Sequence, residues 1–150
     1  MAGGRTPPNP SEAARFSITI DGVEIASFSE LVELTSGLDP SGLTLAPGRG
    51  GKRSVRKLPG KRVPPTVTLK RGLTNSLDLW AWHKQALEGT AARRNAVLVM
   101  FDVQGEPVAR FHLESAWPSK VEINGLKAGA SEVLMETVLI VAADIERLSP

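Results

Sequence analysis

The chain has 150 residues, a length that suits one domain able to bury a core of its own. It contains no cysteine, which excludes disulfides and thiolate chemistry. Its formal net charge of +2 is too small to indicate nucleic-acid binding from the total alone, and no apolar run approaches the roughly 20 residues of a membrane-spanning helix.

The first part of the chain predicts a flexible arm followed by a β-hairpin. The first ten residues are rich in Gly, Pro and Asn and lack the apolar core of a secretory signal. We therefore expect residues 1–15 to form a flexible N-terminal arm and residues 16–150 to form a single domain. Phe16–Ile20 and Val23–Phe28 alternate apolar and polar side chains, and Asp21-Gly22 between them favours a tight turn, so these strands should pair as a hairpin.

A long basic segment follows. Residues 37–65 contain six Gly and five Pro and predict a long extended loop, in which Leu43–Leu45 and Ser54–Leu58 indicate an extended hairpin that a partner orders. No acidic residue lies between Asp39 and Asp78, whereas nine of the chain's 18 Lys and Arg residues do. This asymmetry indicates either a basic patch that meets an acidic partner, such as a second copy of the chain, or a solvated basic loop.

One strand and one helix come next. Thr66–Lys70 is rich in β-branched residues and predicts a strand. The periodicity that follows predicts a helix over about residues 75–88, with Gly89 as its C-terminal stop. The candidates for its N-terminal cap are Thr74, Asn75 and Ser76.

The helix carries two tryptophans only two positions apart, so both cannot face the core. We expect Trp80 to pack inward. For Trp82 the sequence leaves two alternatives open, the edge of the core or a subunit interface.

The C-terminal half predicts further antiparallel strands. We expect strands at Asn95–Asp102 and Pro107–Glu114 around the hairpin connection Val103–Glu106, a corner at Trp117-Pro118, a short strand around Val121 and Ile123, and a long strand at Glu132–Ile145. The last of these is apolar on both sides and should be covered on both faces. Together the elements indicate a mainly β (α+β) fold, a small antiparallel β-barrel or sandwich with one flanking α-helix and a long extended loop.

No pattern in the sequence indicates a catalytic, cofactor-binding or metal site. A Walker A motif fails because Ala46 and Val55 stand where its first glycine is required before the two Gly-Lys pairs. His83 and His112 are the only histidines, and without cysteine a metal would need carboxylates from elsewhere in the chain. We therefore expect no enzyme activity, no cofactor and no metal. The alternative function is a nucleic-acid-binding module that uses residues 49–71 together with an exposed tryptophan.

A set of short motifs occurs in one order along nearly the whole chain. These are Phe16–Gly22, Phe28-Ser29-Glu30, Ser36-Gly37-Leu38, Arg56–Gly60 (R-K-L-P-G), Val67–Thr74 (V-T-L-K-R-G-L-T), Leu79–Trp82 (L-W-A-W), Asp102–Phe111 and Ala116–Lys120 (A-W-P-S-K). Their order resembles the inner tail-tube protein family of contractile-tailed phages and phage-derived contractile injection systems. One departure is Leu31–Thr35, which intervenes between two of the motifs and would suit a specialised copy near the baseplate as well as a main tube subunit.

The resemblance implies a structural protein with a fold similar to that of the type VI secretion tube protein. Six copies would form a ring, and rings would stack into a hollow tube inside a contractile sheath. The subunit and ring interface would include Arg53, Arg56, Lys57, Leu58, Pro59, Gly60 and Trp82. The implied partners are other copies of the chain, a sheath protein, baseplate and tube-terminating proteins, and a cargo of protein effector or DNA in the lumen, with no membrane anchor. The implied location is a phage tail or phage-tail-like particle that is assembled in the bacterial cytoplasm and can be released from the cell.

Overall fold

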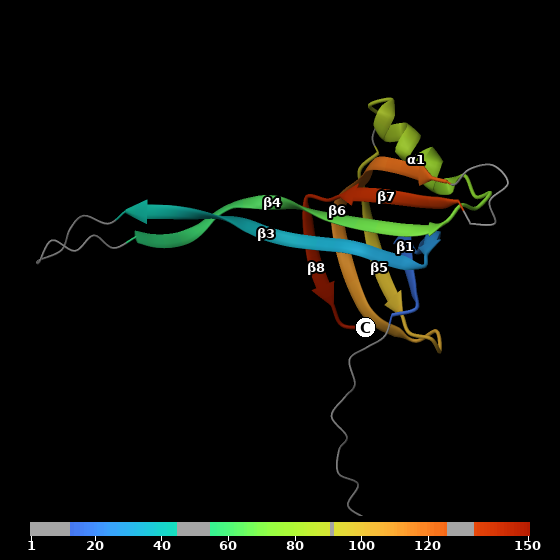
Figure 1. Cartoon of the computed structure of the whole chain (residues 1–150), viewed down its shortest axis with the longest axis horizontal. Coiled ribbons are helices and arrows are strands. Elements are labelled where there is room, and N and C mark those ends of the chain that lie inside the picture. The colour runs from blue at the N-terminus through green and yellow to red at the C-terminus, as the bar shows by residue number, and fades with distance from the viewer. Residues whose placement is uncertain (1–12, 45–54, 91, 126–133) are drawn as a thin grey trace, which may run out of the picture.

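The computed structural model describes residues 13–44, 55–90, 92–125 and 134–150, with the backbone alone for residues 41–44 and 55–57. This part of the chain contains eight strands and one helix, so the expectation of a mainly β fold with one helix is confirmed (Figure 1). In chain order they are β1 (Arg15–Ile20), β2 (Val23–Phe28), β3 (Glu30–Thr44), β4 (Val55–Gly72), α1 (Asp78–Leu87), β5 (Arg94–Phe101), β6 (Pro107–Asn124), β7 (Met135–Val141) and β8 (Asp144–Leu148).

The strands form one antiparallel sheet that curls over on itself. Their order is β2-β1-β5-β6-β7-β4-β3, and β8 pairs with β6 beside this path. The strands at the two ends of the order, β2 and β3, are consecutive in the chain, with only Ser29 between them. The Ser29 amide donates a hydrogen bond to the Lys70 carbonyl at 3.1 Å, which joins this corner to β4. The two ends of the sheet are therefore brought together, as a barrel or sandwich requires.

Two tight turns follow from their sequences. Asp21 and Gly22 have φ angles of 51° and 79°, the left-handed values that a two-residue hairpin turn needs, and β1 pairs with β2 as expected. In the β5–β6 connection Gly105 has a φ of 83°. There the carboxylate Oδ1 of Asp102 accepts from the amides of Gln104 and Glu106, each at 2.9 Å. Both predicted hairpins are confirmed.

Strand β6 is longer than the sequence suggested. The corner expected at Trp117-Pro118 is a change of pairing partner within one continuous strand, because β6 pairs with β5 up to Ala116 and with β7 from Trp117 onward. A register irregularity between Pro118 and Lys120 accompanies the change. Proline lacks an amide donor, which interrupts the ladder locally and makes an uninterrupted strand hard to recognise from sequence.

The long strand expected at Glu132–Ile145 is divided. Its first two residues lie outside the described part, β7 ends at Val141, and β8 begins at Asp144. At the break the Ala142 amide donates to the Pro65 carbonyl at 3.0 Å and the Ala143 amide donates to the Glu114 carbonyl at 2.8 Å. These bonds turn the chain from β4 toward β6. In β7, one side is buried and the other is half-buried.

The helix is shorter at its start than expected and ends where expected. It begins at Asp78, its N-cap is Leu77, and no side chain caps it. Thr74 instead accepts from the Ser76 amide at 3.3 Å within the preceding connection, so the predicted cap is wrong. Gly89, with a φ of 72°, donates from its amide to the Ala86 carbonyl, and the Thr90 amide donates to the Gln85 carbonyl. This pair of bonds is a Schellman motif, which explains the stop at Gly89.

The core lies between the curled sheet and the inner side of α1. Two helix side chains join it, Leu79 and Trp82. The largest fully buried side chains of the sheet are Phe28, Ile18, Leu69, Leu98, Leu113, Ile140, Val67, Val138 and Pro118. The β4 and β7 residues among them alternate with half-buried neighbours, the pattern of strands with one face in a core.

Candidate functional site

The most distinctive feature of the molecule is a two-stranded ribbon that leaves the body (Figure 1). We call its described part the arm and define it as Leu38–Thr44 of β3 and Val55–Arg62 of β4. The arm strands pair with each other from Leu38 opposite Arg62 to Thr44 opposite Val55. Strand β4 gains β7 as a second partner only from Thr66 onward. Among the described strands, therefore, both outer edges of the arm lack a partner.

The arm confirms the predicted extended hairpin, although its composition is that of a loop. Register irregularities fall between Thr35 and Gly37 and between Leu38 and Pro40 of β3. Such bulges raise the local twist and bend a ribbon, and an edge tolerates proline because an amide there needs no ladder partner. Gly and Pro thus shape the ribbon here and do not end it.

Five of the seven residues predicted for the interface lie on the arm. Arg53 lies outside the described residues. The backbones of Arg56 and Lys57 pair with Leu43 and Gly42 in the arm. Leu58 and Pro59 are exposed and Gly60 is half-buried. The structure thus places five of the predicted residues on β4, with Leu58 and Pro59 at the surface.

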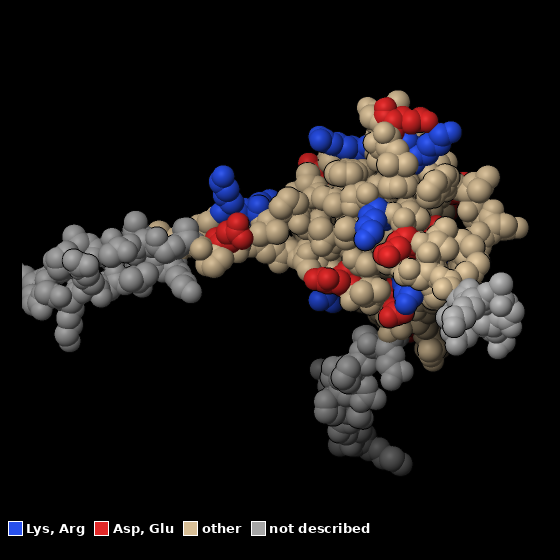
Figure 2. All heavy atoms as spheres, turned by 45° about the horizontal axis from the view of Figure 1, so that its top comes forward, with Lys and Arg blue, Asp and Glu red and all other residues tan. Residues whose placement is uncertain are grey.

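The arm is connected to the body at a shallow groove of about 480 Å³. Arg62, at the base of the arm, lies 3.3 Å from the carboxylate of Asp144, measured from Nη1 to Oδ1. Both side chains are largely exposed, so this ion pair contributes at most about 1 kcal/mol to stability. Figure 2 shows acidic and basic side chains side by side where the arm meets the body. The groove is lined by Ser36, Gly37, Leu38, Arg62, Val63, Pro65, Ala143, Asp144 and Ile145.

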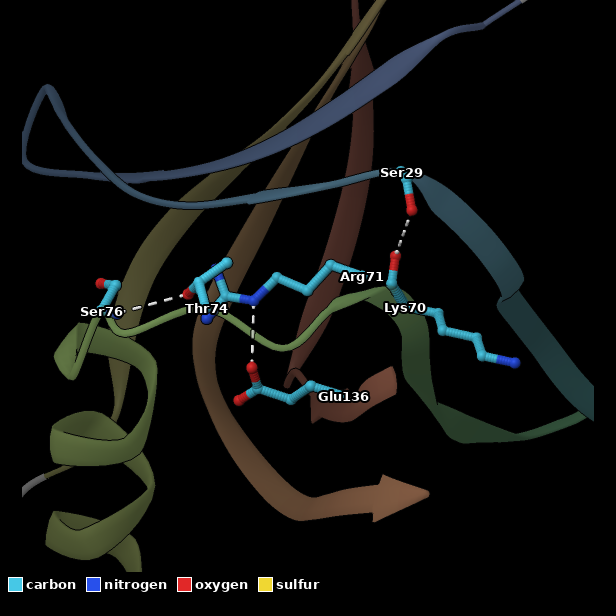
Figure 3. Close-up of polar contacts among 6 residues, drawn as sticks. All are labelled: Ser29, Lys70, Arg71, Thr74, Ser76 and Glu136. Atoms are coloured by element: carbon cyan, nitrogen blue, oxygen red, sulfur yellow. Dashed lines mark hydrogen bonds and ion pairs between the residues drawn. The ribbon is translucent and has the colours of Figure 1, made fainter. Parts of the chain in front are cut away.

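A buried ion pair fixes β4 in the body. Arg71 of β4 and Glu136 of β7 are only 6% and 5% exposed, and the Nε of Arg71 donates to the Oε2 of Glu136 at 3.1 Å (Figure 3). The guanidinium carbon also lies 5.2 Å from the centre of the Phe28 ring. The Nη2 atom of Arg71 is buried and has no hydrogen-bond partner.

Sequence reasoning assigned Arg71 to the basic segment and missed this pair. A signal was present in the strand alternation. Arg71 falls on the same side of its strand as Val67 and Leu69, and Glu136 on the same side as Val138 and Ile140. Two opposite charges at inward positions of neighbouring strands indicate a buried pair.

Of the two tryptophans of α1, Trp82 lies in the core and Trp80 does not. Trp82 is 5% exposed, and its Nε1 donates to the Ala92 carbonyl at 2.6 Å. Of the two alternatives for Trp82, this position favours the core, and an interface role stays a prediction. Trp80 is 47% exposed, so its expected place in the core is wrong. The cause is helical phase, because Leu79, Trp82 and His83 face the sheet and Trp80 lies to the side of them.

Both histidines lie in the described part of the chain, one buried and one half-buried. His83 is buried, and its Nδ1 lies 2.9 Å from the Pro118 carbonyl, so this ring joins α1 to β6. His112 is half-buried on β6. Within the described ranges no group of three or more His, Asp or Glu side chains is placed to hold a metal ion. The helix of the described part falls short of the length and apolarity that a membrane crossing requires.

Comparison with known proteins identifies the architecture. The family model for the T4-like virus tail tube protein gp19 matches residues 12–146. No protein of curated function matches the chain by sequence.

Several solved structures with a similar fold come from contractile injection particles. The chain is 17% identical to one in the tube-terminating cap of the anti-feeding prophage, with a TM-score of 0.77 over 99% of this chain and 97% of that one. It is 15% identical to one in the extended sheath–tube complex of the PVC extracellular contractile injection system, with a TM-score of 0.76 over 95% and 93%. It is 20% identical to one in the anti-feeding prophage baseplate, with a TM-score of 0.74 over 96% and 97%.

Proposed function

Since the chain belongs to the family of the T4-like virus tail tube protein gp19, it is a tail tube subunit, and we propose that six copies form a ring and that rings stack head to tail into a hollow tube. The role is mechanical. The tube is the rigid conduit of a phage tail or a phage-tail-like injection particle, and the protein catalyses no reaction.

The arm is the observation that carries this proposal. A two-stranded ribbon without a third strand or a covering layer is marginally stable in water. The arm extends beyond the body and, within the described residues, has both edges unpaired. A neighbouring copy that covers these edges stabilises the arm, so ordering of the arm and assembly are linked. The predicted interface residues Arg56, Lys57 and Leu58 lie on this ribbon.

Lateral contact within a ring is supported by other unpaired edges. β3 ends the strand order, and the last residues of β6, Lys120–Asn124, pair with β7 alone among the described strands. Joining β3 of one copy to this part of β6 in the next would continue one sheet around the ring and form the wall of the lumen. Such a contact joins two different surfaces of identical copies. It produces a closed ring when the rotation from one copy to the next returns to the first copy.

The partners follow from the same proposal. Similar folds occur in structures described as a sheath–tube complex, a baseplate and a tube-terminating cap. We therefore assign to this protein a sheath around the tube, baseplate and terminating proteins at its ends, and a cargo of protein effector or DNA in its lumen. Assembly takes place in the bacterial cytoplasm, and the particle acts outside the cell that made it. The comparisons give the nucleic-acid-binding alternative no support.

Charge reversal in the arm tests the proposal. The variant Arg56→Glu/Lys57→Glu should remain a folded subunit by circular dichroism, and its assembly should be weakened at least about tenfold, because the contact loses its electrostatic complementarity. Negative-stain electron microscopy and light scattering measure the tubes. Arg93→Glu/Arg110→Glu makes the same change in net charge on exposed residues away from the arm and serves as the control. Normal tube formation by the arm variant would refute the role of the arm.

A further inference from the structure

A groove runs along the outer edge of β2, on the side of the molecule where α1 begins. It consists of two adjoining hollows of about 320 Å³ and about 350 Å³, both of which Ile25 and Asp78 line. Strand β2 forms one wall, and the other is α1 with the connection that precedes it. The two hollows together therefore follow the exposed side of β2.

The β2 wall can accept another strand. Among the described strands β2 pairs only with β1, so one edge of its backbone has no ladder partner. Val23, on this strand, is 63% exposed and lines the groove with Ile25. An unpaired edge beside apolar side chains binds extended chains through backbone hydrogen bonds, with the side-chain pockets providing specificity.

A buried donor in the groove also lacks an acceptor. Arg71 lines the hollow together with Thr74 and Ser76, and Figure 3 shows its guanidinium extending toward Thr74. One nitrogen of this group, Nε, is bonded to Glu136, whereas Nη2 is buried without a partner. Native proteins rarely leave a buried charged donor unsatisfied, so this atom favours an acceptor oxygen beside it, from water or from an occupant of the groove.

Two exposed acids, Glu24 and Asp78, line the groove. The Glu24 carboxylate also pairs with Nη1 of Arg15 at 2.6 Å, and Arg94 lines the second hollow, so Asp78 is the acid of the groove that has no ion pair among the described residues. The sequence of the arm carries Arg56, Lys57, Lys61 and Arg62 and no acid on its β4 strand. The arm extends away from its own body, so an arm that reaches this groove belongs to a second copy (Figure 1).

We propose that this groove is the acceptor site for the arm of a second copy. The outer edge of β4 in the arm adds to β2, the basic side chains of the arm face Glu24 and Asp78, and an oxygen of the arm accepts from Nη2 of Arg71. The inference rests on the proposed stacking of rings and adds to it the surface that receives the arm.

A charge exchange tests the pairing. The groove variant Glu24→Lys/Asp78→Lys and the arm variant Arg56→Glu/Lys57→Glu should each lower the tube fraction at least about tenfold while remaining folded. The chain that carries all four substitutions restores opposite charges and should form tubes to within about twofold of the wild type, since the coupling belongs to the pair. The control Glu106→Lys/Glu146→Lys reverses two other exposed acids and should assemble normally.

Cross-linking provides a second measurement that does not depend on charge. The chain has no cysteine, so Val23→Cys and Leu58→Cys introduce a single pair of thiols, one on β2 and one on the arm. A short bis-maleimide should link copies of this variant in assembled tubes. Val103→Cys with Leu58→Cys is the control, because Val103 is equally accessible but lies in the β5–β6 turn.

The outcomes separate this inference from the proposed function. Normal tubes from the groove variant, or failure of the four-substitution chain when both parent variants fold, would overturn the assignment of the groove and leave the tube intact. Cross-links no more frequent than in the Val103 control would do the same, and would direct attention to another occupant such as residues 1–12 of a neighbour. A wild-type protein that forms no rings or tubes would overturn the proposed function itself, and the inference with it.

Discussion

Arg71 and Glu136 lie directly opposite each other on β4 and β7, and their side chains form an ion pair inside the protein. The pair sits at the end of β4 that is remote from the arm, next to its last residue Gly72, so it joins β4 to β7 within the body. A buried pair of this kind is costly to break, because the remaining charge has neither water nor a counter-charge.

Removal of one partner should therefore destabilise the subunit strongly. We predict that Glu136→Ala lowers the free energy of unfolding by about 3–5 kcal/mol, and that Arg71→Met/Glu136→Leu recovers most of this loss. Urea unfolding of the unassembled protein measures both values. Glu88→Ala, which removes an exposed partner of Lys84 at 3.8 Å, should change stability by no more than about 0.5 kcal/mol. Equal losses in Glu136→Ala and Glu88→Ala would contradict the structural role of the buried pair.

The two tryptophans should respond differently to the same substitution. Trp82→Phe removes the donor to the Ala92 carbonyl and part of a buried side chain, so it should lower stability by about 1–3 kcal/mol. Trp80→Phe alters an exposed ring and should stay within about 0.5 kcal/mol of the wild type. Thermal or urea unfolding measures the stability of both variants. A larger loss of stability in Trp80→Phe than in Trp82→Phe would show that the Trp80 side of the helix, and not the Trp82 side, faces the core.

The Gly89 stop gives a backbone prediction. Gly89→Ala places a side chain at a φ of 72° and should destabilise the subunit by about 1 kcal/mol. Gly37→Ala is the matched control, since a methyl group there meets nothing within 4 Å and the backbone lies outside the left-handed region. The same unfolding measurement applies to both variants. A loss of stability in Gly37→Ala, next to the arm, as large as that in Gly89→Ala would mean that the backbone geometry of Gly89 does not explain the effect.

The arm amides should become better protected from hydrogen exchange when the protein assembles. In the free subunit, amides of Leu38–Thr44 and Val55–Arg62 should exchange with solvent much faster than those of β5 and β6, because the arm contains two strands and no covering layer. In assembled tubes the arm amides should become protected. Hydrogen exchange by mass spectrometry detects the difference, with the β1–β2 turn as an internal reference. Arm amides already as protected in the free subunit as those of β5 would contradict coupled ordering and docking.

The sequence predicts the local backbone conformation correctly wherever one residue type determines it. Asp21-Gly22 and Gly89 specify their turn and stop through left-handed φ angles, and both are where the sequence predicted them. The arm was also recognisable as an extended hairpin. Its Gly and Pro content nonetheless suggested a loop, because proline is compatible with a strand only when the strand has a free edge, which a sequence does not reveal.

The features that the sequence analysis missed depend on partners distant in the chain. Arg71 counts in the sequence only as one cation of the basic segment, because Glu136 stands 65 positions away. Strand β6 was divided at Pro118 because its change of partner from β5 to β7 is a property of the sheet. The expected core position of Trp80 is wrong because a start at Asp78 and contacts with β6 set the helical phase. The β2 groove has no sequence signature, since it arises where β2, Arg71 and α1 meet.

The most direct measurement is electron microscopy of the purified wild-type protein, combined with its mass by light scattering. The account predicts rings and hollow tubes whose end views have six-fold symmetry, with a mass that rises in steps of six subunits. A protein that stays monomeric at every concentration, or that forms only sheets and fibres without a lumen, would contradict the claim that this chain builds a tube. If that monomer also bound oligonucleotides with a strong dependence on salt, the nucleic-acid-binding alternative would replace it.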